Sequence, residues 1–171
     1  KNRRENVRKA VEMVIGGSLE KLRVAKSILI KPNLVDHQRQ LASTHVDAVR
    51  GVIDAIRKHS KAPIIIGDAG YHGTKPAFRN FGYENLSVEY DLVDLYDLND
   101  DVTVPGFYIK KDGSRGQMGI SKKVYDADFT VSLANMKTHR DVGVTLAIKN
   151  WSLGIWVVKS KIGIHGKYWP R

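Results

Sequence analysis

The stretch ILIKPNLVDHQRQLASTHVDAVRGVIDAIRKHSKAPIIIG, residues 28–67, decides the fold. It begins and ends with a short apolar run, at residues 28–30 and 64–66, and turn-forming residues follow both runs. Such runs are typical of buried strands. The segment between them carries apolar residues at helical spacing: Val46, Val49, Val52, Ile53 and Ile56. We therefore predict a strand–helix–strand unit, which is parallel and right-handed if the strands pair.

Further elements follow from the same kind of pattern. Thr44 and Asp47 resemble a capping box at the start of this helix. The spacing predicts another helix over 3–15, ended by Gly16-Gly17, and a short helix over 75–81, capped by Thr74. Further strands are predicted at 87–93 and 129–133.

The second half of the chain is less regular. Residues 102–104 and 107–109, split by Pro105-Gly106, predict a hairpin, and Asp112-Gly113 is a further turn signal. Residues 120–125 fit a strand or a helix, and residues 144–153 fit a helix or an apolar loop with a helical turn. Strands that alternate with helices predict an α/β fold: an open, mostly parallel sheet with helices on both faces and an added antiparallel hairpin.

Composition limits the class of protein. The chain has 171 residues, 42% of them hydrophobic, and no apolar run reaches the length of a membrane-spanning helix. No cysteine is present, so this segment holds no disulfide and no iron–sulfur cluster, and any other cofactor stays unknown. We expect a single α/β domain over 1–153 and a basic, aromatic tail over 154–171 that continues into a missing C-terminal part. Lys1 is not followed by a signal-peptide core, and we expect a cytoplasmic protein.

The net charge of +10 is unevenly distributed along the chain. Residues 1–31 carry +6, residues 32–109 carry −4 and residues 110–171 carry +8. A basic balance fits an anionic partner such as a phosphate, a carboxylate or a nucleic acid, although most of these charges also fit an ordinary solvated surface.

Polar residues gather where the predicted strands end. They are Lys31, Pro32 and Asn33 after the first strand, Asp68, Gly70 and His72 after the second, Asp94 after the third, and Asn135, Lys137, Thr138 and His139 after the last. In open parallel sheets the ligand crevice lies at the carboxyl ends of the strands, so these residues should converge there. The glycines at 67, 70 and 73 can present backbone N–H groups to a phosphate, although their spacing matches neither a P-loop nor the dinucleotide fingerprint.

Several side chains have a functional and a structural interpretation. Lys31 can hold an anion or stand on the surface before a turn, and Asn33 can simply bond the turn. His139 can act as a general base or a metal ligand, or belong to a basic loop with Lys137 and Arg140. Lys149, at the end of an apolar run, can be a nucleophile or a cofactor attachment point, or can extend to the surface. We expect the buried form, with its ammonium paired to Asp68 and to the backbone around Asn135, and with His139 nearby.

Five segments taken together resemble the family called domain of unknown function 362. They are Ile-Leu-Ile-Lys-Pro-Asn-Leu-Val (28–35), Ile-Ile-Gly-Asp (65–68), Tyr-Asp-Ala-Asp-Phe-Thr-Val-Ser-Leu (125–133), Lys-Thr-His (137–139) and Thr-Leu-Ala-Ile-Lys-Asn (145–150). Many members carry a ferredoxin-type iron–sulfur module, which this cysteine-free segment cannot ligate. The resemblance implies the N-terminal part of the family domain and no particular activity.

The chain is also similar to the N-terminal domain of nickel-pincer lactate racemases. In that family a lysine carries the pincer cofactor and a later histidine binds nickel. The spacings here from His139 to Lys149 and from Lys149 to His165 match, but Ala147-Ile148 stands where the racemases have Gly-Gly. The resemblance implies only that His139, Lys149 and His165 line one pocket, with the two histidines as candidate metal ligands.

These observations favour a domain that binds a small anionic ligand or cofactor at the carboxyl edge of the sheet, with a role as an enzyme left open. The expected ligand-binding residues are Lys31, Asn33, Asp68, Gly70, Lys137, Thr145 and Asn150, and the expected catalytic residues are His139 and Lys149. The alternatives are a nucleic-acid-binding module and an accessory domain of an iron–sulfur protein. The apolar residues of the tail, Trp156, Val157, Val158 and Trp169, are expected to pack on a partner subunit or on a missing segment.

Overall fold

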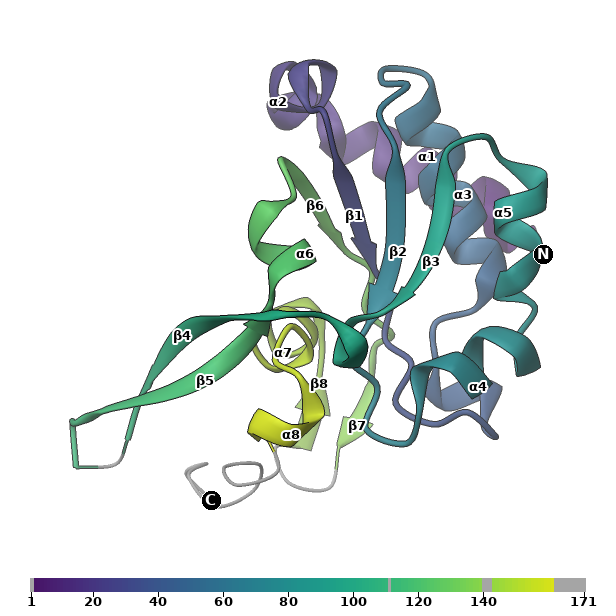
Figure 1. Cartoon of the computed structure of the whole chain (residues 1–171). Coiled ribbons are helices and arrows are strands. Elements are labelled where there is room, and N and C mark those ends of the chain that lie inside the picture. The colour runs from purple at the N-terminus through teal and green to yellow at the C-terminus, as the bar shows by residue number, and fades with distance from the viewer. Residues whose placement is uncertain (1, 111, 140–142, 162–171) are drawn as a thin grey trace.

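The computed structural model describes residues 2–110, 112–139 and 143–161. Its central sheet consists of β1 (Ile28–Lys31), β2 (Ile64–Asp68), β3 (Val93–Asp97) and β6 (Phe129–Ser132). The strands lie in the order β3-β2-β1-β6 and all pair in parallel (Figure 1). The predicted α/β class and the parallel strand–helix–strand unit are therefore confirmed.

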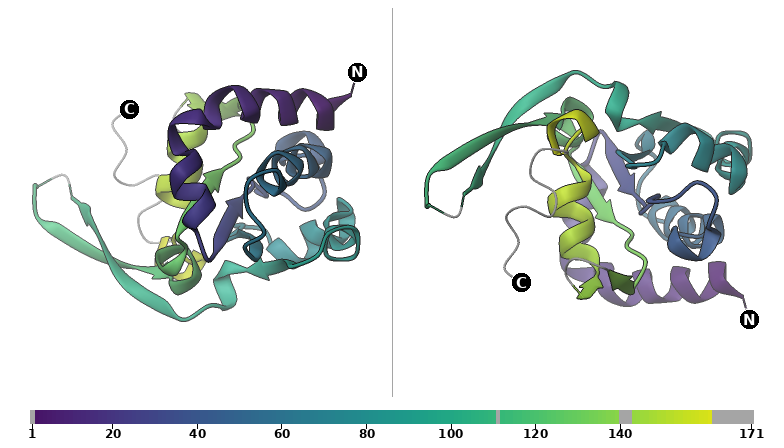
Figure 2. Two further views of the ribbon diagram at one scale, coloured as in Figure 1. Left: turned by 90° about the horizontal axis from the view of Figure 1, so that it is seen from above. Right: turned by 90° about the horizontal axis from the view of Figure 1, so that it is seen from below.

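Helices cover both faces of this sheet (Figure 2). Successive side chains of a strand point to opposite faces, so Ile28 and Ile30 join one core and Leu29 joins another. The first core is closed by α1 (Arg3–Val14), α2 (Leu19–Val24) and α3 (Val46–Arg57). The second is closed by α6 (Lys122–Asp126) and α7 (Ala147–Gly154). The predicted glycine stop after the first helix is confirmed, because the 3-10 turn η1 (Ile15–Ser18) follows α1.

Helix α3 begins one residue later than the capping box implied. Its N-cap is His45, whose Nδ1 accepts a hydrogen bond from the Asp47 backbone at 3.1 Å. The Thr44 hydroxyl instead accepts from the Asn33 backbone and donates to the Leu133 carbonyl, both at 2.9 Å. The predicted cap is therefore wrong: Thr44 ties together the chain segments that follow β1 and β6.

The segment between β2 and β3 is mostly helical. It contains α4 (Thr74–Asn80), η3 (Tyr83–Asn85) and α5 (Leu86–Glu89), so the strand predicted at 87–93 is wrong. Leu86 is buried while the next three side chains are exposed, a one-sided pattern that suits a helical turn. The strand lies further on, and Asp94 is an exposed residue inside β3 rather than a residue beyond its end.

The hairpin exists, but its turn lies elsewhere. Strand β4 (Thr103–Ile109) runs straight through Pro105-Gly106 and pairs with β5 (Arg115–Ser121), with Pro105 opposite Gly119. Proline is tolerated because β4 is an edge strand with no second neighbour among the described residues. The turn falls at Asp112-Gly113, where Gly113 has a φ of 79°. The resulting ribbon projects from the body (Figures 1 and 2).

Residues 120–125 and 144–153, for which the sequence left two structures open, each contain the end of a strand and a helix. Ser121 ends β5 before α6 begins, and β8 (Gly143–Thr145) precedes α7. Strand β8 pairs with β7 (Lys137–His139) in a small antiparallel sheet that the sequence did not predict. The remaining short elements are η2 (Gln40–Ala42), η4 (Leu98–Asp100) and α8 (Val158–Lys161).

The start of the tail packs on its own chain. Trp156 and Val157 are both buried, Val157 N donates to the Gly119 carbonyl at 3.2 Å, and Trp156 forms a β-bridge with Ile120. The expectation that these two residues need a partner subunit or a missing segment is therefore wrong, because the base of the ribbon covers them. Trp169 lies outside the described residues. No helix in the described part of the chain is long and apolar enough to cross a membrane.

Candidate functional site

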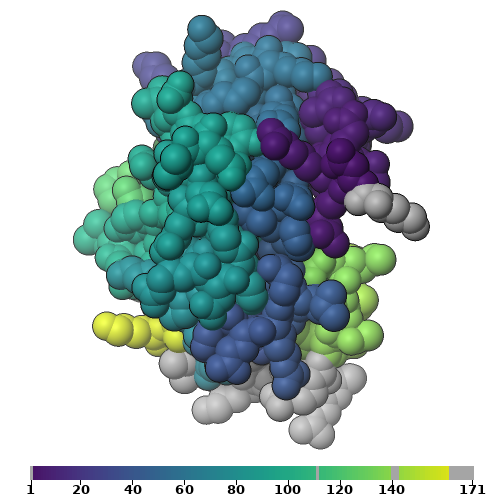
Figure 3. All heavy atoms as spheres, turned by 90° about the vertical axis from the view of Figure 1, so that its right-hand side faces the viewer, coloured from purple at the N-terminus to yellow at the C-terminus, as the bar shows by residue number. Residues whose placement is uncertain are grey.

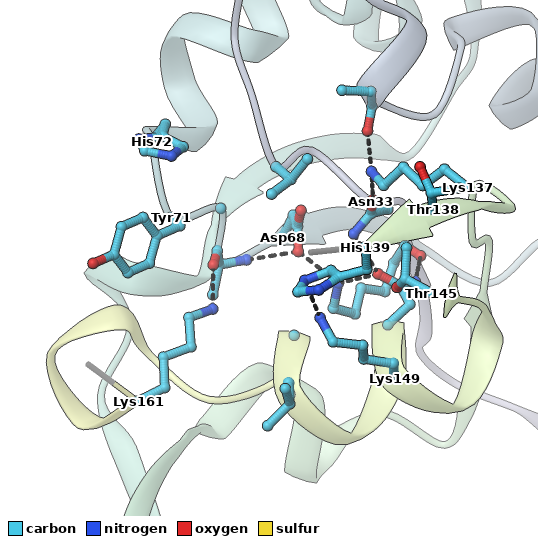
Figure 4. A pocket seen from close by; sticks show the side chains of 18 residues that line it. Asn33, Asp68, Tyr71, His72, Lys137, Thr138, His139, Thr145, Lys149 and Lys161 are labelled. Carbon is cyan, nitrogen blue, oxygen red and sulfur yellow. Dashed lines mark hydrogen bonds and ion pairs between the residues drawn. The ribbon is translucent and has the colours of Figure 1, made fainter. Parts of the chain in front are cut away.

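A pocket of about 650 Å³ lies at the carboxyl ends of β1 and β2, between the loops that follow them and helices α7 and α8 (Figure 4). This is where ligands bind in open α/β sheets. The pocket is lined by all the described residues that we expected to bind ligand or act in catalysis: Lys31, Asn33, Asp68, Gly70, Lys137, His139, Thr145, Lys149 and Asn150. His165 lies outside the described residues, and Asp94 and Asn135 do not line the pocket.

Lys31 and Asp68 form a buried ion pair at the floor of the pocket. Lys31 Nζ donates to Asp68 Oδ1 at 2.6 Å, to the Asn150 side-chain oxygen at 2.9 Å and to the Pro32 carbonyl at 3.0 Å. An ammonium has three protons, so all of them are used. Asp68 accepts two further bonds, from the backbone N–H groups of Leu34 and Ala69. The pair holds the ends of β1 and β2 together, and the expected role of Lys31 in holding a ligand anion stays a prediction.

Two asparagines extend this network across the sheet edge. Asn150 Nδ2 donates to Ser132 Oγ at 3.1 Å and to the Lys31 carbonyl at 3.3 Å, which joins α7 to β6 and β1. Asn33 Nδ2 donates to Asn150 Oδ1 at 3.2 Å, and Asn33 Oδ1 accepts from Lys137 Nζ at 2.5 Å. Both amides are thus satisfied by protein groups. Their role is to position Lys137 and helix α7 against the sheet.

Two glycines permit close packing around the ion pair. A Cβ atom on Gly154 of α7 would overlap Lys31 Cε and Nζ, and one on Gly70 would meet the Leu34 carbonyl. The loop with glycines at 67, 70 and 73 is closed by hydrogen bonds within itself. Gly70 N donates to Thr74 Oγ1 at 3.0 Å, and Thr74 Oγ1 donates to the Asp68 carbonyl at 3.0 Å. The predicted cap at Thr74 is therefore also wrong: Thr74 is the first residue of α4, and its hydroxyl closes this loop.

Lys149 lies in the pocket wall with His139 beside it, as expected, but its ammonium contacts that histidine instead of Asp68. Its Nζ lies 2.8 Å from His139 Nε2, so helix α7 and strand β7 meet there (Figure 4). Asp68, the partner we expected, is taken by Lys31. When Lys149 is an ammonium, it donates a hydrogen bond to His139 Nε2. The imidazole must then be neutral and carry its hydrogen on Nδ1. The Lys149 ammonium and the His139 imidazole are therefore close enough to share a proton between Nζ and Nε2.

Two further lysines face the pocket without a carboxylate within 4 Å among the described residues: Lys137 and Lys161. Lys137 Nζ also donates to the Ala42 carbonyl, and Lys161 Nζ donates to the Ala69 carbonyl at 2.6 Å. Burial first, and then the charges of Lys149 and Lys31, lower the pKa of each ammonium to about 8, while the charge of Asp68 opposes the change. The protein thus concentrates positive charge in a place where that charge is costly.

Replacing Lys161 by Met should stabilise the free protein at pH 7. A pKa of about 8 instead of 10.5 corresponds to roughly 3 kcal/mol of destabilisation, and the lost hydrogen bond offsets about 1 kcal/mol of the gain. Urea denaturation of Lys161→Met should therefore show a free energy of unfolding that is higher by about 2 kcal/mol.

The difference in unfolding free energy between wild type and Lys161→Met should depend on pH. Lys161 faces Asp68, Lys31, Lys149 and Asp97, and its folded pKa lies below its unfolded pKa. Between about pH 8 and 10.5 the unfolded state binds more protons, so wild-type stability rises relative to the variant. The difference should shrink when denaturation is repeated at pH 9.5. A variant less stable than wild type at pH 7 would contradict the electrostatic account of this lysine.

The lining also contains residues that the sequence did not single out: Val35, Ala42, Ala69, Tyr71, Leu153, Gly154 and Lys161. Tyr71 stands at the pocket with its ring edge-on to His72. Lys161 carried a weak signal, because Val157 lies four residues before it and places it one helical turn beyond an apolar pair. The sequence places it in the basic tail, whereas in the structure this segment folds back under the loop after β2.

Fold and site together define an α/β domain with a lysine-rich pocket at the carboxyl edge of a parallel sheet. The chain belongs to the family described as "Domain of unknown function (DUF362)", whose model matches residues 28–169. No curated protein matches it. Among solved structures it is similar to the lactate racemase apoprotein from Thermoanaerobacterium thermosaccharolyticum, with 25% identity and a TM-score of 0.63. The match covers 94% of this chain and 38% of the racemase chain. Both resemblances seen in the sequence are confirmed.

The racemase resemblance raises the question of a nickel site. His139 is in the pocket, but the described residues contain no group of three or more histidine, cysteine, aspartate or glutamate side chains that could hold a metal ion. His165, the second predicted ligand, lies outside the described residues, so the assignment of His139 and His165 to a metal stays a prediction. We therefore derive no chemistry through nickel.

Proposed function

We propose that this domain binds a small anionic ligand, bearing a carboxylate or a phosphate, in the pocket at the carboxyl edge of its sheet. The observation that carries the proposal is the charge of the lining. Four lysines and one carboxylate, Asp68, line the described part of the pocket, and that carboxylate is already paired with Lys31. An anion held by Lys137 and Lys149 would offset the charge that burial makes unfavourable.

The shape of the site favours a small molecule over a polymer. The lysines line one pocket instead of spreading over a face, and the aromatic Trp156 is buried under the ribbon. A nucleic-acid surface needs exposed aromatic groups beside a contiguous basic face. The neighbouring lactate racemase also fits, since lactate is a small carboxylate. His139 and Lys149 add a pair able to hold or transfer a proton next to the anion, which suits an enzyme.

Calorimetric titration with sodium phosphate and with sodium lactate tests the proposal, at constant ionic strength and pH 7. We expect saturable binding of at least one of the two probes, with one site per chain. The control variant is Lys21→Gln, which removes an exposed lysine of α2 and should leave the dissociation constant unchanged. Heats that never saturate, or that fall equally in the control variant, would show that only general surface charge attracts these anions.

A further inference from the structure

Besides Lys31, the lysines of the pocket fall into two sets: Lys161 lies on one side of Asp68, and Lys137 and Lys149 lie on the other (Figure 4). Lys161 contacts the carbonyl of Ala69, directly after β2, and its helix α8 is held to η4 by a bond from Val158 N to Asn99 Oδ1 at 2.8 Å. This places the first set on the β2–β3 side of the sheet edge. Figure 4 shows it beneath the loop that carries Tyr71.

The second set lies on the β1–β6 side. Lys137 contacts Asn33 after β1 and the carbonyl of Ala42, while Lys149 meets His139 of β7, which follows β6. Strands β2 and β6 flank β1, so they are two strand spacings apart, or about 10 Å. The cations are therefore held at strand ends that lie apart along the sheet edge, which suits a ligand with an acidic group at each end better than a single carboxylate.

The ion pair keeps the two sets separate. Lys31 and Asp68 fill the floor between them, and all three protons of Lys31 are used within the protein. The centre of the pocket is therefore close to neutral, while each end presents ammonium protons: the Ala69 carbonyl takes one of the three on Lys161, and Asn33 and Ala42 take two on Lys137.

We infer that the ligand is a dianion with two separated acidic groups, one held by Lys161 and the other by Lys137 and Lys149. This inference rests on the proposed function and names its ligand class: a small dicarboxylic acid, or a carboxylic acid that also carries a phosphate. Joining two acidic groups makes the second contact intramolecular, so such a ligand binds more tightly than either group alone.

A series of dicarboxylates of increasing length measures this directly. The probes are succinate, glutarate, adipate and suberate, each compared with the monocarboxylate of the same chain length, by calorimetry at constant ionic strength. We expect one length to bind at least about tenfold more tightly than its monocarboxylate. The compound 3-phosphonopropionate, in which a phosphonate replaces one carboxylate of succinate, shows whether an end prefers a phosphate.

Variants separate the two claims. Lys161→Met, which we expect to fold stably, should lower the affinity for the best dicarboxylate about tenfold, to that of its monocarboxylate, while Lys21→Gln keeps the full preference. Dicarboxylates that bind no better than monocarboxylates, or a preference that survives in Lys161→Met, would overturn the two-ended ligand and leave the proposed function standing. Binding of none of the carboxylates, together with no binding of phosphate or lactate, would contradict the proposed function as well.

Discussion

Replacing Lys31 by Met should lower the free energy of unfolding by about 3–5 kcal/mol, the cost of breaking a buried ion pair from one side. The Lys31 side chain is fully buried, and the Asp68 side chain is only 4% exposed. Without Lys31 the carboxylate keeps two backbone N–H donors and loses its counter-charge. Urea denaturation at pH 7 measures the loss.

A double-mutant cycle identifies the cause. Asp68→Asn removes the charge, so adding it to Lys31→Met should cost less than it does in wild type, with a coupling energy of at least about 1 kcal/mol. The surface variant Lys21→Met should change stability by no more than about 0.5 kcal/mol. Additive effects of the two pocket substitutions would mean that the pair does not hold β1 and β2 together.

Lys149→Ala should weaken phosphate or lactate binding by about 2–3 kcal/mol, or roughly 30- to 150-fold, and leave the fold intact. Lys149 is partly exposed and its ammonium contacts His139 in the pocket wall, so its removal disturbs the anion site more than the core. Lys149→Arg should not restore affinity, because a planar fork does not replace a compact ammonium beside the imidazole.

Calorimetry gives the affinity of both Lys149 variants, and circular dichroism checks their fold. Unchanged affinity in Lys149→Ala would show that this lysine does not bind the anion. Full recovery in Lys149→Arg would show that only the charge is required and that the geometry of the His139 contact is not.

The sheet was predictable because its central strands carry unbroken apolar runs. Both β1 and β2 are buried on two faces, which leaves Ile28–Ile30 and Ile64–Ile66 no alternative to a buried strand. The peripheral elements were harder. Pro105-Gly106 has the composition of a turn, yet pairing with β5 carries the chain straight through it. Local composition does not reveal such a partner.

The location of the site was predictable from the sequence, but the pairing of its side chains was not. Strand-end residues converge as expected, because parallel strands end at one edge. His139 lies near Lys149 as expected. The pairing of Asp68 with Lys31 instead of Lys149 was not predictable, because it depends on distances between side chains that are more than 30 residues apart in the sequence. Lys161 was missed because the fold of the tail is set by contacts with β5 and η4.

The most direct test of the central claim is to observe the lysines themselves while an anion is added. Correlation spectra of lysine Cε groups labelled with carbon-13 resolve single side chains, and variants at 137, 149 and 161 assign them. With sodium phosphate at constant ionic strength, we predict large, saturable shifts for Lys137 and Lys149 and little change for Lys31 or the exposed Lys21. Small, non-saturating shifts of similar size at all lysines would contradict an anion-binding pocket at this sheet edge.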